Sequence, residues 1–139
     1  MRIQLLSIFL FLCFVSCSDS EDEGFFGKWQ GTDIIIIDGN PTVSETSAVI
    51  AEIEDMTIEC NVIANGLSYI FDSKEVDGKL VFTNAPAKNL EGLTIETLIT
   101  GSAELKADTL LIFNHQVVTM DGSTIISAVD YNLEFKREE

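Results

Sequence analysis

Turn signals recur at short intervals along most of this chain, and each segment between them has the length of a single β-strand. Asn-Gly and Asp-Gly are strong hairpin signals, because both central residues of a type I′ turn have positive φ. The seven signals are Asp38-Gly39-Asn40-Pro41, Glu54-Asp55, Asn65-Gly66, Asp77-Gly78, Ala85-Pro86 through Glu91-Gly92, Lys106-Ala107-Asp108 and Asp121-Gly122. We therefore predict eight strands, roughly over residues 26–37, 42–53, 56–64, 67–75, 79–84, 92–104, 108–119 and 123–136.

Alternating hydrophobicity supports an antiparallel sheet with one packed and one solvated face. Near the C-terminus one face carries Val129, Tyr131, Leu133 and Phe135, and in an earlier strand one face carries Met56, Ile58, Cys60 and Val62. The run Ile34–Ile37 is apolar on both faces, which predicts either cover on two sides or a bend. No stretch has helical periodicity, although residues 86–91 are compatible with one helical turn inside a loop.

Eight sequential strands can close into an all-β, antiparallel up-and-down barrel, which removes the exposed sheet edges. The interior of such a barrel is filled by side chains or holds one small ligand. A two-sheet β-sandwich is the alternative that the same pattern allows.

The N-terminus predicts export and a lipid anchor. Residues 1–16 carry one base and an apolar run of about 13 residues, shorter than the roughly 20 needed to span a bilayer. Ser16-Cys17 follows, and this arrangement resembles a bacterial lipoprotein signal in which Cys17 becomes the lipidated N-terminus. Residues 17–24 then form an acidic tether that resembles the surface-export signal of Bacteroidetes lipoproteins, and residues 25–139 form the folded domain. These resemblances imply an outer-membrane lipoprotein exposed on the cell surface.

The charge of the chain limits its partners. It carries 8 basic and 23 acidic residues, and removal of residues 1–16 takes away only one base, Arg2. Nucleic acid is excluded as a partner because phosphate binding requires a basic surface. Attachment to anionic membranes is expected through the lipid on Cys17 rather than through the protein surface. With Cys13 in the signal and Cys17 lipidated, Cys60 has no partner for an intrachain disulfide.

The first strand opens with Gly27-Lys28-Trp29, which is similar to the Gly-x-Trp signature of lipocalins and especially of short lipocalin-like lipoproteins of Bacteroidetes. In that superfamily the Trp closes one end of the barrel and a basic residue late in the last strand packs across it. The resemblance therefore implies that Trp29 and Arg137 form a structural, barrel-closing pair. This chain is shorter than the larger lipocalins and lacks a clear helix before its last strand.

The sequence contains no motif for catalysis, a cofactor or a metal. We interpret His115, the only histidine, as a strand-end or loop residue and Cys60 as a small core residue. The acids Glu52, Glu54, Asp55 and Glu59 match no calcium loop and are interpreted as a solvated turn. Seven aromatic residues are candidates either for a ligand pocket or for the core: Phe25, Phe26, Tyr69, Phe71, Phe82, Phe113 and Tyr131.

These observations favour a non-enzymatic binding module of the cell envelope. Its expected ligand is small and apolar or amphipathic, with Tyr69, Phe71, Phe82, Phe113 and Tyr131 as the candidate contacts. The alternative is a filled barrel that serves as a protein–protein interaction subunit of an outer-membrane complex.

Overall fold

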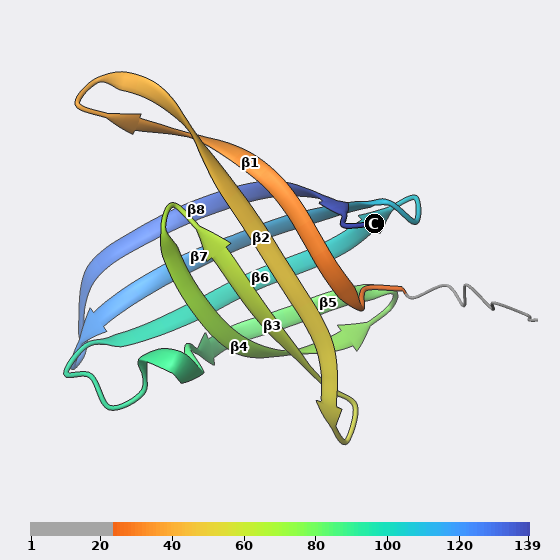
Figure 1. Cartoon of the computed structure of the whole chain (residues 1–139). Helices are drawn as coiled ribbons and strands as arrows, with labels where there is room; N and C mark the ends of the chain where they lie inside the picture. The colour runs from red at the N-terminus through yellow and green to blue at the C-terminus, as the bar shows by residue number, and fades with distance from the viewer. Residues whose placement is uncertain (1–23) are drawn as a thin grey trace, which may run out of the picture.

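The computed structural model describes residues 24–139, which form eight antiparallel β-strands and one short 3-10 helix (Figure 1). The strands are β1 (Gly27–Ile37), β2 (Asn40–Glu54), β3 (Thr57–Ala64), β4 (Leu67–Val76), β5 (Lys79–Pro86), β6 (Glu96–Lys106), β7 (Leu110–Asp121) and β8 (Thr124–Arg137), with η1 (Lys88–Leu90) between β5 and β6. Each strand pairs with the next, and β8 returns to pair with β1. The predicted up-and-down barrel is confirmed, and the closed ring rules out the two-sheet sandwich.

The hairpin turns have the backbone conformation that their sequences require. Both central residues have positive φ at Asp38-Gly39, Asn65-Gly66 and Asp77-Gly78, as in type I′ turns. Between β2 and β3, Asp55 and Met56 also have positive φ, so a methionine occupies a position where glycine is usual. The sequence pattern placed Met56 on the packed face of a strand, and this was wrong: its side chain is 81% exposed at the turn.

Predicted and observed strand limits agree within about two residues, except at the start of β6. The prediction began this strand at residue 92, whereas β6 begins at Glu96, because the loop after η1 continues through residue 95. The single helical turn expected within residues 86–91 is η1. Of the run Ile34–Ile37, the Ile34 side chain is exposed, so the expected cover on two sides is not present at this residue.

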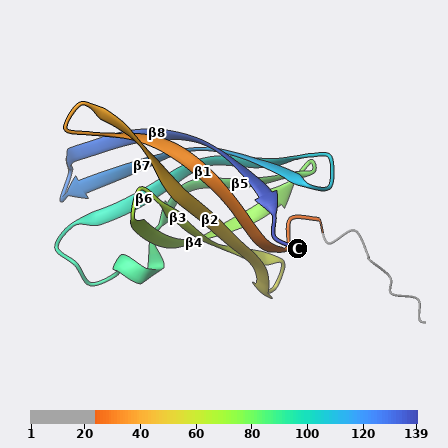
Figure 2. The same cartoon turned by 45° about the horizontal axis from the view of Figure 1, so that its top comes forward.

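The ring is barrel-like but is not evenly round, because two of its eight strand junctions are short. β4 and β5 share three residue pairs, and β1 and β8 share three, whereas β7 and β8 share twelve. The paired end of the β1/β8 junction lies where the chain enters β1 and leaves β8, at one end of the molecule in both Figure 1 and Figure 2. We call this the closed end.

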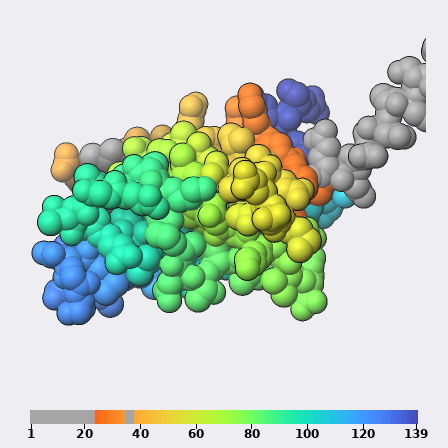
Figure 3. Space-filling model, turned by 90° about the horizontal axis from the view of Figure 1, so that it is seen from below, coloured from red at the N-terminus to blue at the C-terminus, as the bar shows by residue number. Residues whose placement is uncertain are grey.

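Beside the short β4/β5 junction, side chains from the loop after β5 bond to β4 in place of a neighbouring strand. Asn89 Nδ2 donates to the Ser68 carbonyl and Asn89 Oδ1 accepts from the Ile70 N–H, both at 2.8 Å, so one amide replaces a ladder partner of β4. Lys88 Nζ lies 2.7 Å from Glu59 and 3.0 Å from Asp72, and these carboxylates raise the pKa of Lys88. Figure 3 shows this green-to-teal segment lying against the neighbouring strands on the lower face of the molecule.

The core lies inside the ring and is built from alternate residues of every strand. Its largest fully buried side chains are Trp29, Ile50, Phe71, Leu80, Ile99, Leu111, Phe113, Leu133 and Phe135. Cys60 is buried among them, as expected. In β8 the apolar face is only partly packed, since Leu133 and Phe135 are buried whereas Val129 is exposed. Burial therefore ends where β8 extends beyond the body of the ring.

Candidate functional site

Trp29 and Arg137, the pair implied by the lipocalin-like resemblance, lie together at the closed end. Trp29 is fully buried and donates from Nε1 to the Phe25 carbonyl at 2.9 Å. The Arg137 guanidinium carbon lies 4.3 Å from the centre of the indole ring, a cation–π geometry. Arg137 also donates to the carbonyls of Phe26 and Gly24, at 2.7 and 2.6 Å. The pair thus connects the segment before β1 to the end of β8.

Four of the five candidate ligand contacts belong to a packed aromatic cluster. Tyr69, Phe71, Phe82 and Phe113 are all 3% exposed or less. The Phe71 and Phe82 ring centres are 4.8 Å apart, and Phe82 and Phe113 are 5.4 Å apart, the distances of direct ring contact. A ligand could reach these rings only by displacing side chains that already fill the space.

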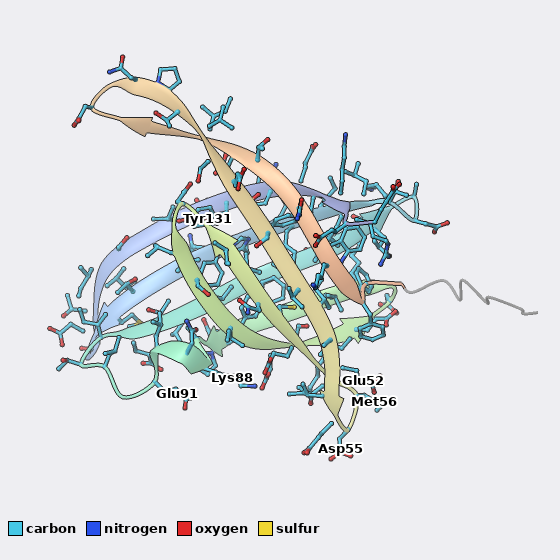
Figure 4. All side chains as sticks on the ribbon, in the orientation of Figure 1. Glu52, Asp55, Met56, Lys88, Glu91 and Tyr131 are labelled. Atoms are coloured by element: carbon cyan, nitrogen blue, oxygen red, sulfur yellow. The ribbon has the colours of Figure 1, made fainter. Side chains whose placement is uncertain are left out.

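The fifth candidate, Tyr131, lies at the other end of the ring from the β2–β3 turn, which carries Asp55 and Met56 (Figure 4). Its side chain is half-buried and stacks on His115, with ring centres 5.1 Å apart and planes inclined by 15°. We call Tyr69, His115 and Tyr131 the tyrosine–histidine cluster. It is the part of the aromatic interior that reaches towards solvent.

The prediction that His115 lies at a strand end or in a loop was wrong. His115 lies within β7, is 5% exposed, and its Nε2 shares a hydrogen bond of 2.6 Å with the Tyr69 hydroxyl. The signal that could have found it is the alternation of Leu111, Phe113 and His115, which places the ring on the packed face. The polar neighbours Asn114 and Gln116 obscured this pattern.

Burial keeps two members of this cluster, His115 and Tyr69, uncharged. Desolvation lowers the pKa of His115 to about 4, although the Phe113 backbone partly opposes the shift. Desolvation also raises the pKa of Tyr69 well above its usual value near 10. Both groups are therefore neutral at pH 7. A neutral imidazole enclosed by aromatic rings can stabilise the interior.

The acidic turn between β2 and β3 borders a surface concavity of about 570 Å³ near the closed end. Phe26 and Ile58 contribute apolar surface, whereas Glu52, Asp55 and Asp77 contribute carboxylates. Figure 4 shows Glu52, Asp55 and Met56 close together at this turn. Within residues 24–139 no group of three or more His, Cys, Asp or Glu side chains is arranged to hold a metal ion.

A second, larger concavity of about 880 Å³ follows the β1/β8 junction, and we call it the junction groove. Its lining includes Gly31 and Thr32 of β1, Thr46 of β2 and Glu134 of β8. Thr46 is 3% exposed, and its Oγ1 has no hydrogen-bond partner within the described part of the chain. The sequence alone gave no sign of this groove, because it depends on where β1 separates from β8.

Cys17 and the acidic tether lie almost entirely outside the described residues, which begin at Gly24. In the described part of the chain no helix is long and apolar enough to cross a bilayer. No protein-family model matches this chain, and no match is found among curated proteins or among solved structures. The lipocalin-like and lipoprotein resemblances therefore stay predictions.

Proposed function

We propose that this chain is a lipid-anchored, non-enzymatic lipoprotein of the outer membrane that binds another envelope protein through the outside of a filled barrel. The observation that carries the proposal is the packing of Phe71, Phe82 and Phe113. These rings occupy the interior of the ring and are no more than 3% exposed, so that the surface and the strand edges are the parts free to bind. Of the two functions expected from the sequence, this geometry favours the interaction subunit.

The position of the closed end supports the same arrangement. Arg137 donates to the Gly24 carbonyl at this end, and Gly24 is the last residue of the acidic tether. A lipid on Cys17 would then attach to the closed end, and the opposite end would extend away from the membrane. This is the orientation that a surface-exposed docking protein requires.

Native mass spectrometry of the full chain purified from its own host tests the filled barrel. We expect the mass of the polypeptide with its lipid modification and no additional small molecule. A stoichiometric small molecule that is released on denaturation would contradict the proposal and restore the small-ligand function. Trp29→Phe is a suitable control, because this substitution at the closed end should not change the ligand content.

One observation favours a small ligand as the second candidate function. Tyr131 is half-buried, and its ring stacks on that of the buried His115. An apolar molecule could therefore stack on the part of the Tyr131 ring that is exposed to solvent. A fluorescent naphthalene sulfonate, used as an apolar anionic probe, should then bind the full chain and lose affinity at least tenfold in Tyr131→Ala. Equal binding by Tyr131→Ala would exclude this site.

A further inference from the structure

Two strand edges diverge beside the junction groove. The register of β1 with β8 consists of Trp29↔Arg137, Gln30↔Lys136 and Gly31↔Phe135. Beyond these pairs, residues 32–37 of β1 pair only with β2, and residues 124–134 of β8 pair only with β7, within the described part of the chain. Figure 1 shows the β1–β2 hairpin rising away from β8. An edge of this length is a template for an added strand.

A close backbone approach marks the point where the strands separate. A Cβ atom on Gly31 would overlap the Glu134 carbonyl oxygen and would lie 3.0 Å from Thr46 Oγ1. Only glycine allows the two backbones to come so close, so the divergence begins at a fixed position. The unpartnered Thr46 hydroxyl lines the groove at this same position, which leaves buried hydrogen-bonding capacity beside the open edges.

The free edge of β8 offers backbone groups as well as apolar side chains. The Glu138 N–H donates to the Lys28 carbonyl at 2.9 Å, so the alternation of an antiparallel ladder directs the even-numbered residues of β8 towards β1. The N–H and C=O groups of Asn132 and Asp130 then face the gap. Apolar side chains exposed on the two edge strands are Ile34 of β1 and Ile125, Ile126 and Val129 of β8.

The charge along the open part of the gap is negative, whereas Lys136 and Arg137, the two cations that line the junction groove, lie at its paired, closed end. Neither residues 32–54 nor residues 107–135 contain a single Lys or Arg, whereas Asp33, Glu45, Asp130 and Glu134 lie on the strands that border the gap. A second copy would bring the same carboxylates together, and the acidic tether has the same sign of charge. Both are therefore poor occupants, whereas a cationic segment is complementary.

We propose that the gap between β1 and β8 accepts an extended, lysine- or arginine-bearing segment of a partner protein, which adds to the free edge of β8 as a strand. Main-chain hydrogen bonds to alternate residues of β8 supply affinity in this mode of recognition, and side chains supply specificity. The inference rests on the proposed function, since it names the surface and the kind of partner by which the filled barrel docks.

A synthetic nine-residue peptide of alternating valine and lysine tests this proposal on the full chain purified in detergent. By NMR, the peptide should slow hydrogen exchange of the Asp130 and Asn132 amides at least tenfold. The Tyr131 and Leu133 amides, which face β7, should change little. A peptide of alternating valine and glutamate should bind at least tenfold more weakly. Lysine-peptide binding without this alternating protection would overturn the proposal, because it would reflect surface charge alone.

Asn132→Pro provides a test, because proline lacks the N–H that faces the gap and is tolerated on a free edge, and Asn132→Ala controls for loss of the side chain. Peptide affinity should fall at least tenfold in Asn132→Pro and stay within threefold in Asn132→Ala. If Asn132→Pro fails to fold, the pattern of hydrogen-exchange protection that the peptide causes in the unmodified chain still decides whether the proposal holds. Protection of Asp130 and Asn132 without peptide, together with a dimer in sedimentation, would identify a second copy and overturn the cationic partner.

Failure here is distinguishable from failure of the proposed function. If native mass spectrometry finds no small molecule and the lysine peptide does not bind, only the strand-addition inference is wrong. A stoichiometric small molecule would contradict the filled barrel itself, whatever the peptide does.

Discussion

At the level of single residues, the interior of this barrel is stabilised by a histidine that must stay uncharged. His115 contacts rings on several strands, including Phe113 at 5.3 Å and Tyr131 at 5.1 Å between ring centres, and shares its Nε2 with the Tyr69 hydroxyl. Protonation would place a positive charge in this enclosed aromatic environment. The free energy of unfolding should therefore have a pH-dependent contribution from His115.

The sign of that dependence follows from the two pKa values of His115. The folded value is about 4 and the unfolded value is 6.5, so between these pH values the unfolded chain binds the extra proton. The contribution of neutral His115 to the free energy of unfolding is then fully present above pH 6.5 and is lost as the pH falls towards 4. The full shift corresponds to about 3 kcal/mol. Denaturation of the wild type at pH 7.0 and 4.5 should show this loss. His115→Gln should lose less stability between these two pH values. An equal loss in the wild type and in His115→Gln would show that His115 is not the source of the pH dependence.

Trp29 and Arg137 should contribute to stability for different reasons. Trp29→Ala removes a fully buried aromatic side chain and should lower the free energy of unfolding by about 3–5 kcal/mol. Arg137→Ala leaves several backbone carbonyls without a charged donor and should lower it by about 1–3 kcal/mol. The exposed neighbour Lys136 is the control, and Lys136→Ala should change stability by less than about 0.5 kcal/mol. Chemical denaturation measures the free energy of unfolding of all three variants. Similar values for Arg137→Ala and Lys136→Ala would show that Arg137 does not help to close the barrel.

At the level of elements, the ring depends on side chains where its ladders are short. In Asn89→Ala the Ser68 carbonyl and the Ile70 N–H lose their partner, so the loop should detach from β4 at a cost of about 1 kcal/mol. Hydrogen exchange of the Ile70 amide should then become at least tenfold faster. Asn89→Asp keeps the acceptor for Ile70 and should preserve more of the protection. Unchanged exchange at Ile70 in Asn89→Ala would show that the loop does not seal this junction.

The sequence predicted those features that depend on local geometry. Asn65-Gly66 and Asp77-Gly78 require positive φ, so the turns, the strand limits and hence the order of strands around the ring could be predicted. The side-chain contacts at the short β4/β5 junction and the gap between β1 and β8 could not be predicted, because they depend on residues that are distant in sequence. Asn89 contacts β4 from about 20 residues away, and nothing local indicates that β1 leaves β8 after Gly31. His115 could have been placed from its strand parity, but its bond to Tyr69 could not.

At the level of the whole molecule, the two ends of the barrel differ in chemistry. The closed end carries Trp29, Arg137 and the point where the chain enters the fold, whereas the other end carries Tyr131 and the free edges of β1 and β8. With a lipid on Cys17, the first end would face the membrane and the second would face possible partners. The polarity of the fold thus matches the proposed function only if Cys17 is the anchor.

That anchor can be tested on the whole chain with an internal control. Because lipid chains on Cys17 would supply the attachment to the membrane, Cys17→Ser should abolish labelling by fatty acid and release the chain from the membrane fraction. Cys60 is buried inside the ring and burial raises its pKa to about 12, so it is a poor nucleophile for modification. Cys60→Ser should therefore leave both labelling and fractionation unchanged. If Cys17→Ser still sediments with membranes and the wild type takes up no fatty acid, the lipoprotein prediction is wrong, and the closed end has no reason to face the membrane.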